Sequence, residues 1–355
     1  MGSLVLQWAC HGPGRGGVGQ ASTPRATRRT VLAGIAAALA PGSQAALAQH
    51  AAARRLGVLS VLDAADPTTK ATDTALVDGL SALGWKDGGN LRIDWRHAGG
   101  SAELVAQFAA ELVTLTPDVL LATGTLCVEE LRRRTHTIPT VFVAITDPMG
   151  QGFVANLAHP GGNITGFTDF DSPMAGEWLE MISQQIAPPA VHVSVLYNPE
   201  TAPFADLMLR AIQDATKQVA AKIRAAPVRD ETEIAAAIEK LSQEEHGGLL
   251  VLPDSFTLVH RTVIVATTAR IRVPAVYWNS AFIAEGGLMS YGVVQPDLFR
   301  SSARYIDRIL KGANPGDLPV QNPTTYEMVI NLKTARALGI TIDPSLVAGA
   351  DQVIE

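Results

Sequence analysis

The amino-acid sequence predicts an α/β protein of two doubly wound lobes, each built on a parallel sheet. Short, almost continuously apolar runs alternate with helical patterns from residue 54 onward, which is typical of parallel sheets covered on both faces. The alternation stops near residue 146 and restarts near residue 174. Between them lies DPMGQGFVANLAHPGGNITGFTDF, residues 147–170, whose five glycines and two prolines favour turns.

The first series has four expected strands, at residues 56–62, 91–95, 119–122 and 140–145. Helices are expected at residues 68–83 and 101–115, where apolar side chains recur at helical spacing. The second series has expected strands at residues 191–197, 222–228, 249–252 and 275–277. Its helices are expected at residues 174–186 and 204–219, with a third marked by Ile234, Ile238 and Leu241. The two series are similar in size, so two lobes of the same kind are expected.

Composition and charge exclude several classes of function. The chain has 355 residues, of which 47% are hydrophobic, so two domains with substantial cores are expected. The net charge of −6 and the lack of a basic face argue against a nucleic-acid partner. Cys10 and Cys127 form no disulfide framework, and no Cys/His group has the spacing of metal ligands, so no metal or cofactor is expected. No apolar run reaches the roughly 18 residues of a membrane-spanning helix.

The N-terminal region is expected to be an export signal. Arg25, Arg28 and Arg29 precede an apolar run at residues 31–40, and the small-residue triplet at 46–48 follows. This layout predicts a secretory signal within residues 1–48 that is cleaved after Ala48. The pair Arg28-Arg29 favours the twin-arginine route over the general one. A G-x-G-x-x-G pattern at residues 12–17 has no strand before it and is not interpreted as a dinucleotide site.

The turn-rich stretch is interpreted as the join between two lobes that close on a hinged cleft. Ligands of parallel sheets bind beyond the carboxyl ends of the strands, so polar residues at those ends are candidates for the site. The candidates are Ser60, Asp63, Thr123, Gly124, Thr125, Thr146, Asp147, Thr168, Asp169, Asn198, Asp254, Trp278 and Tyr291. Their hydroxyl, carboxylate and aromatic groups suit a small polar or zwitterionic ligand. The alternative for each polar residue is a turn or a helix cap.

An enzyme is the competing class, and the sequence argues against it. It contains no G-x-S-x-G, H-E-x-x-H or P-loop motif, and no two histidines are spaced as a metal pair. No catalytic residue is therefore assigned.

Two long segments carry a resemblance to a known family. The segment at 140–167, with DPMGQGFVANLAHPGGNITGF, and the segment from GGLMSYG at 286–292 to the C-terminus resemble ABC-transporter substrate-binding proteins, including tryptophan- and tyrosine-binding members. The likeness covers residues 54–355. It implies a type I periplasmic binding protein fold, in which two Rossmann-like lobes are joined by three crossovers and close around a ligand.

The resemblance also implies boundaries and partners. The first lobe is expected at residues 54–166 plus 281–296, and the second at 167–280 plus 297–355. The hinge is expected near residues 166–171, 278–281 and 291–297. The expected function is that of a monomeric periplasmic solute-binding component, which passes a ligand such as an aromatic amino acid to a membrane permease. The alternative is the ligand-sensing domain of an exported receptor.

Four candidate residues match positions of the family. Gly124 and Thr125 resemble the turn after the third strand of the first lobe, and Asn198 resembles the turn after the first strand of the second. Asp254 resembles the position that meets the ligand amino group. The competing interpretation is that Asp254 caps the helix that follows it.

Overall fold

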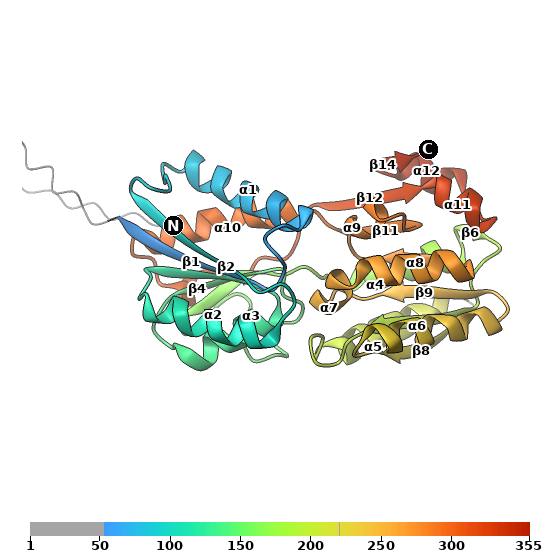
Figure 1. Ribbon diagram of the computed structural model, residues 1–355, viewed down its shortest axis with the longest axis horizontal. Helices are drawn as coiled ribbons and strands as arrows, with labels where there is room; N and C mark the ends of the chain where they lie inside the picture. Colours follow the sequence, from blue (N-terminus) through green and yellow to red (C-terminus); the bar gives the residue numbers. More distant parts are fainter. Residues whose placement is uncertain (1–52, 220) are drawn as a thin grey trace, which may run out of the picture. The chain divides into compact units, whose positions relative to one another are not determined.

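The computed structural model describes residues 53–219 and 221–355. The predicted export signal, its arginine pair and the cleavage position after Ala48 lie outside the described residues. Two large sheets organise the described chain (Figure 1). All neighbouring strands of the first sheet are parallel, and most of those of the second are, which confirms the predicted fold class.

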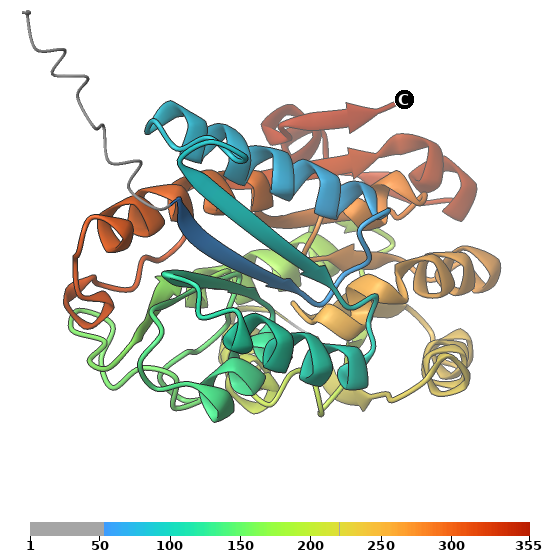
Figure 2. The same cartoon turned by 60° about the vertical axis from the view of Figure 1, so that its left-hand side comes forward.

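The first sheet has five strands in the order β2-β1-β3-β4-β5. They are β1 (Arg54–Ser60), β2 (Leu91–His97), β3 (Val119–Thr123), β4 (Thr140–Val143) and β5 (Ile164–Phe167). On one face lie α2 (Ala102–Thr114) and α3 (Thr125–Arg134), and on the other lie α1 (Pro67–Ala82) and α10 (Gln295–Leu310) (Figure 2). This sheet and these four helices are called the first lobe. Every residue of β3 and β4 is buried, as their apolar sequences predict.

The second sheet has seven strands in the order β14-β12-β11-β10-β9-β7-β8. They are β7 (His192–Tyr197), β8 (Lys222–Pro227), β9 (Gly247–Val251), β10 (Ala275–Tyr277), β11 (Met289–Val293), β12 (Tyr326–Asn331) and β14 (Gln352–Ile354). Its main helices are α4 (Ser172–Ser183), α5 (Ala205–Ala215), α6 (Glu231–Glu239), α7 (Ser255–Val259) and α8 (Arg261–Ile271). Shorter elements are α9 (Ala281–Ala284), α11 (Leu332–Leu338), α12 (Pro344–Gly349) and the antiparallel pair β6 (Ile186–Ala187) and β13 (Thr341–Ile342). This sheet and these elements are called the second lobe.

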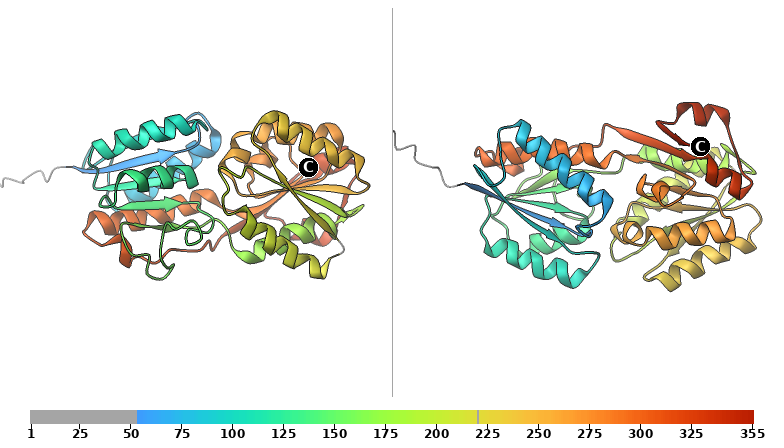
Figure 3. Two further views of the ribbon diagram at one scale, coloured as in Figure 1. Left: turned by 90° about the horizontal axis from the view of Figure 1, so that it is seen from below. Right: turned by 45° about the horizontal axis from the view of Figure 1, so that its top comes forward.

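Two segments belong to the opposite lobe from the one that the predicted boundaries gave them. The first lobe was expected to include residues 281–296, but β11 pairs with β10 and β12 in the second sheet. The second lobe was expected to include residues 297–355, but α10 packs beside α1 against the first sheet (Figure 3). Apolar periodicity shows that a segment is buried. It does not show which of two sheets of similar composition the segment packs against. Residues 318–321, just after α10, also stay with the first lobe, because the amide of Gln321 donates to the carbonyl of Gly166 at 2.9 Å.

The chain passes between the lobes three times, at residues 168–171, near Val294, and at residues 322–325. The crossings are hydrogen-bonded to one another. The Thr168 amide donates to the carbonyl of Gln321 at 2.9 Å, and the Val294 amide donates to that of Thr325 at 3.3 Å. The predicted hinge segments at 166–171 and 291–297 therefore contain crossings, but residues 278–281 join β10 to α9 within the second lobe.

A glycine in β11 gives a prediction about packing beside the second crossing. A Cβ atom at Gly292 would lie 1.7 Å from the backbone oxygen of Trp278. We expect Gly292→Ala to lower the free energy of unfolding by about 3 kcal/mol, because backbone atoms must move apart. The control is Gly176→Ala within α4, where no atom outside the chain neighbours and the local helix backbone lies within 4 Å of the added Cβ. It should raise the free energy of unfolding by about 0.5–1 kcal/mol, since alanine favours helix. Urea unfolding of both variants measures the difference, and equal shifts would contradict the packing argument.

Candidate functional site

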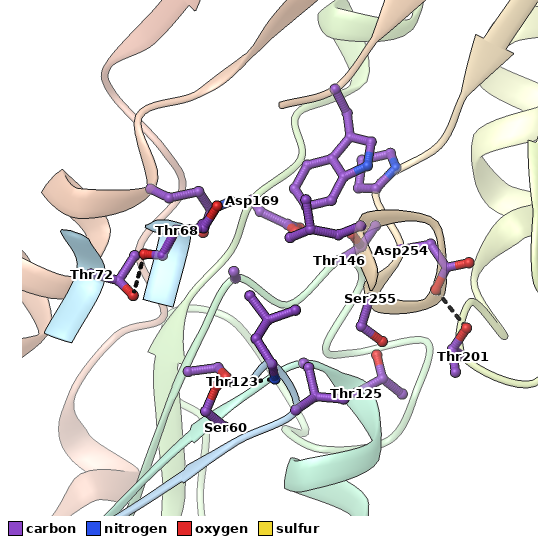
Figure 4. Close-up of a pocket in the computed structure, with 18 of the residues that line it drawn as sticks. Ser60, Thr68, Thr72, Thr123, Thr125, Thr146, Asp169, Thr201, Asp254 and Ser255 are labelled. Carbon is purple, nitrogen blue, oxygen red and sulfur yellow. Dashed lines mark hydrogen bonds between the residues drawn. The ribbon is translucent and has the colours of Figure 1, made fainter. Parts of the chain in front are cut away.

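A cavity lies where the carboxyl ends of strands from both sheets meet (Figure 4). About 70 Å³ of it is open to the centre of a water-sized sphere, several times what one water molecule needs. The first lobe contributes the ends of β1 and β3 and the segment after β4. The second contributes the segments after β9 and β10. This is the edge at which ligands of parallel α/β sheets bind.

Eight of the thirteen candidate residues line this cavity. They are Ser60, Thr123, Gly124, Thr125, Thr146, Asp169, Asp254 and Trp278. The structure therefore brings together residues that are as far as 218 positions apart in the sequence, from Ser60 to Trp278. Strand-end position was the signal that selected them.

The other five candidates lie outside the cavity, and most of them serve turns. Asp63, Asp147 and Asn198 each accept a hydrogen bond from a backbone amide two or three residues later, at 2.7–2.9 Å. The hydroxyl of Thr168 donates to Oδ1 of Asn322, which ties two crossings together. Tyr291 stacks on Tyr326 at 5.8 Å within the second lobe. Short polar side chains stabilise turns as readily as they bind ligands, so the sequence did not separate the two roles.

Helical residues of the first lobe complete the cavity and were not among the candidates. Thr68 and Thr72 on α1, and Gln295 and Phe299 on α10, line it. Each pair is four residues apart, so its members share one helix face. A pair of threonines at this spacing on a buried face was a usable signal for α1. No such signal marked α10, because only the second crossing brings that helix beside α1.

Asp169 is a buried carboxylate on the first crossing. Its Oδ1 accepts a hydrogen bond from the Thr146 hydroxyl at 2.7 Å. Burial raises the pKa of Asp169 from the ordinary 3.8 to about 6. The hydrogen bond from Thr146 lowers the pKa and so opposes part of this shift. The folded pKa lies above the unfolded value, so the folded protein favours the protonated form of Asp169. The stabilisation that follows from this preference is fully present below about pH 4 and is lost as the pH rises through about 6.

Asp254 is also buried, but donors within the second lobe occupy both of its oxygens. Its Oδ2 accepts from the Asn198 amide at 2.9 Å. Its Oδ1 accepts from the Thr201 hydroxyl at 2.5 Å and from the Phe256 amide at 3.0 Å. Burial raises its pKa to about 6 despite these hydrogen bonds. The last contact makes Asp254 the N-cap of α7, as the alternative interpretation of the sequence expected.

The opposite wall of the cavity offers hydrogen-bond donors. Gly124, with φ of 82°, precedes α3, a helix of ten residues whose N-cap position has no side-chain cap. The first amides of a helix lack partners within it and carry a partial positive charge, which favours an anion. The hydroxyls of Ser60, Thr123 and Thr125 line the same part of the cavity (Figure 4).

Apart from Thr201 and Ser255, the remaining residues that line the cavity are apolar. Phe204, Trp278 and Phe299 are each at least nine-tenths buried and supply aromatic surface. Of the described residues that line the cavity, none is Lys, Arg or His. Within residues 53–219 and 221–355, no group of three or more metal-ligating side chains occurs. Over the same residues, no helix has both the length and the apolar character to span a membrane.

The hydrogen bonds of Asp254 predict a structural role for this residue. We expect Asp254→Ala to lower the free energy of unfolding by about 2–3 kcal/mol, because it removes a helix cap and leaves buried donors unpaired. Ligand affinity, measured by calorimetry below the melting temperature, should change less than about threefold, which is under 1 kcal/mol. A variant of unchanged stability that binds at least thirtyfold more weakly would assign Asp254 to the ligand instead.

Comparisons with known proteins agree with this architecture. Residues 57–354 match the family model for ABC transporter substrate binding proteins. A tyrosine-binding protein of Clostridioides difficile is 24% identical over 286 residues, which cover 80% of this chain and 81% of that protein. The structure of an ABC domain from Streptococcus pneumoniae in complex with L-Trp superposes with a TM-score of 0.77 at 28% identity and covers 85% of this chain and 100% of that one. A conserved domain protein from Vibrio cholerae has the same TM-score and identity, and the match covers 84% of this chain and 99% of that one.

The family and these neighbours with a stated role are binding proteins rather than enzymes. The chain belongs to the family of ABC transporter substrate-binding proteins.

Proposed function

We propose that this protein captures a free α-amino acid with an aromatic side chain in the cavity between its lobes. The observation that carries the proposal is Asp169, a buried carboxylate with one side-chain donor, in the same cavity as the uncapped N-terminus of α3. A desolvated carboxylate needs a cationic partner, and a helix N-terminus favours an anionic one. A zwitterion supplies both groups in one small molecule.

In this proposal Asp169 receives the ligand ammonium, a role that the family resemblance suggested for Asp254. The difference lies in their hydrogen bonds. Three donors of the second lobe already occupy the Asp254 carboxylate, whereas Asp169 has the Thr146 hydroxyl. The amides at the start of α3 and the hydroxyls of Ser60 and Thr123 receive the ligand carboxylate.

The apolar lining supports an aromatic body for the ligand. Trp278, Phe204 and Phe299 can cover a ring, and rings prefer offset or edge contacts with such neighbours. The named binding of tyrosine and L-Trp by two relatives points to the same class. Gln295 adds a buried Nε2 with no hydrogen-bond partner in the described structure, so we propose that it donates to an acceptor on the ligand.

Titration calorimetry tests this proposal. We expect L-tryptophan or L-tyrosine to bind, and tryptamine and indole-3-propionate, which lack the carboxylate and the ammonium respectively, to bind at least about thirtyfold more weakly. Asp169→Asn should weaken binding of the amino acid by a similar factor. Asp63→Asn is the matched control, because Asp63 holds a turn outside the cavity and should not change affinity.

The pH dependence adds a second signature of Asp169. A bound ammonium stabilises the ionised carboxylate, so binding below about pH 6 must release the proton of Asp169. Affinity should be constant above about pH 7 and fall by up to about tenfold per pH unit below pH 6. Asp169→Asn should remove this slope. Equal binding of the amino acid and its two analogues, or a slope that survives in Asp169→Asn, contradicts the proposed ligand contacts.

We also propose that the protein is exported, acts as a monomer in the periplasm and delivers its ligand to a membrane permease. The sequence at residues 25–48 and the family support this proposal. Replacement of Arg28 and Arg29 by Lys should leave the precursor in the cytoplasm if export follows the twin-arginine route. N-terminal sequencing of the exported wild type should begin at Gln49. Export that the double substitution does not affect would indicate the general route.

A further inference from the structure

An ion pair joins the two lobes at the rim of the cavity. Nη1 of Arg261 lies 2.7 Å from Oδ2 of Asp66, and the side chains are only 12% and 13% exposed. Asp66 precedes α1 in the first lobe, and Arg261 begins α8 in the second. Neither residue lines the cavity, but each is close in sequence to one that does, Thr68 and Leu258.

Contacts within each lobe hold the two charged groups in place. Oδ1 of Asp66 accepts from the Thr68 amide at 2.8 Å, so the carboxylate caps α1 while its other oxygen faces Arg261. Nη1 of Arg261 donates to the carbonyl of Leu258 at 3.0 Å, and its Nε lies 3.4 Å from Glu285 of the same lobe. The guanidinium therefore keeps an acidic partner when the lobes separate, whereas Asp66 exchanges Arg261 for water.

The two lobes also approach each other closely nearby, at Gly100 and Val259. A Cβ atom built on Gly100, after β2, would lie 3.2 Å from Cγ1 of Val259, the last residue of α7. The two lobes are therefore close together on this side of the cavity, and Asp66–Arg261 is an ion pair between them.

We propose that Asp66 and Arg261 form a latch that favours the closed arrangement and raises affinity without touching the ligand. When the lobes close, both charged groups lose water, and the ion pair between them offsets the cost of this desolvation. Removing one partner leaves the other desolvated in the closed arrangement alone, so the cost falls on closure. Removing both charges eliminates the pair and its desolvation cost together, and closure should largely recover. The proposal does not depend on which ligand the cavity holds.

Disulfide trapping of the ligand-free protein tests the latch. The built Cβ of Gly100 lies 3.8 Å from Cβ of Val259, which suits a disulfide between Gly100→Cys and Val259→Cys in the closed arrangement. Cys at residue 100 must adopt a φ of 84°, but this strain is common to all variants compared. The other thiol of the described chain, Cys127, is buried. The rate of disulfide formation in oxidised glutathione then reports access to closure.

We expect Arg261→Met in this background to slow trapping about tenfold or more, and Asp66→Asn/Arg261→Met to trap within about threefold of the parent. Asn keeps the cap of α1. The matched control is Arg270→Met on the same helix, whose pair with Glu239 lies within one lobe and is exposed, so trapping should not change. Urea midpoints of the reduced proteins check that all variants are folded. Trapping of Arg261→Met at the parental rate overturns the latch, and so does a double variant as slow as the single one.

Discussion

The burial of the Asp169 carboxylate is an energetic constraint at the junction of the two lobes. Asp169 is held on the first crossing between the lobes, with the Thr146 hydroxyl on one oxygen. That position depends on β5 ending beside β4, and on the 168–171 segment being tied to the third crossing. The fold therefore keeps an unfavourable charge where both lobes meet. Such a cost is typical of binding sites, whose groups are arranged for a ligand rather than for the free protein.

Asp169 and Asp254 show that the same pKa shift can accompany two different roles. Burial raises the pKa of both to about 6. Asp254 is surrounded by three donors of its own lobe, which join the turn after β7 to the start of α7. Asp169 has one side-chain donor and faces the cavity lining of both lobes. The number and origin of the hydrogen bonds, rather than the shift, distinguish a structural carboxylate from one that is available to a ligand.

Closure and ligand contact use neighbouring parts of the same elements. The start of α1 supplies Asp66 to the rim and Thr68 to the cavity, and the region of α7 and α8 supplies Arg261 and Leu258. A change of ligand contacts on these elements would therefore also act on the rim. The free energy of binding in such a protein has two contributions: the contacts to the ligand, and the free-energy difference between the open and closed arrangements. Residues outside the cavity can therefore alter the affinity.

The sequence by itself determined the fold class and located eight of the residues that line the cavity. Apolar runs such as those at 119–122 and 140–145 are local signals, because a strand covered on both faces must be apolar throughout. Strand-end position then located Ser60, Thr123, Asp169 and others without any coordinates, since the carboxyl ends of parallel strands share one edge. Only the tertiary structure decided which lobe β11 and α10 join, and hence that Gln295 and Phe299 line the cavity. It also decided that Asp63 and Asn198 hold turns, and that Asp66 meets Arg261 across 195 residues of chain. These outcomes depend on which surfaces pack together, and a pattern within one segment carries no information about the segment that will face it.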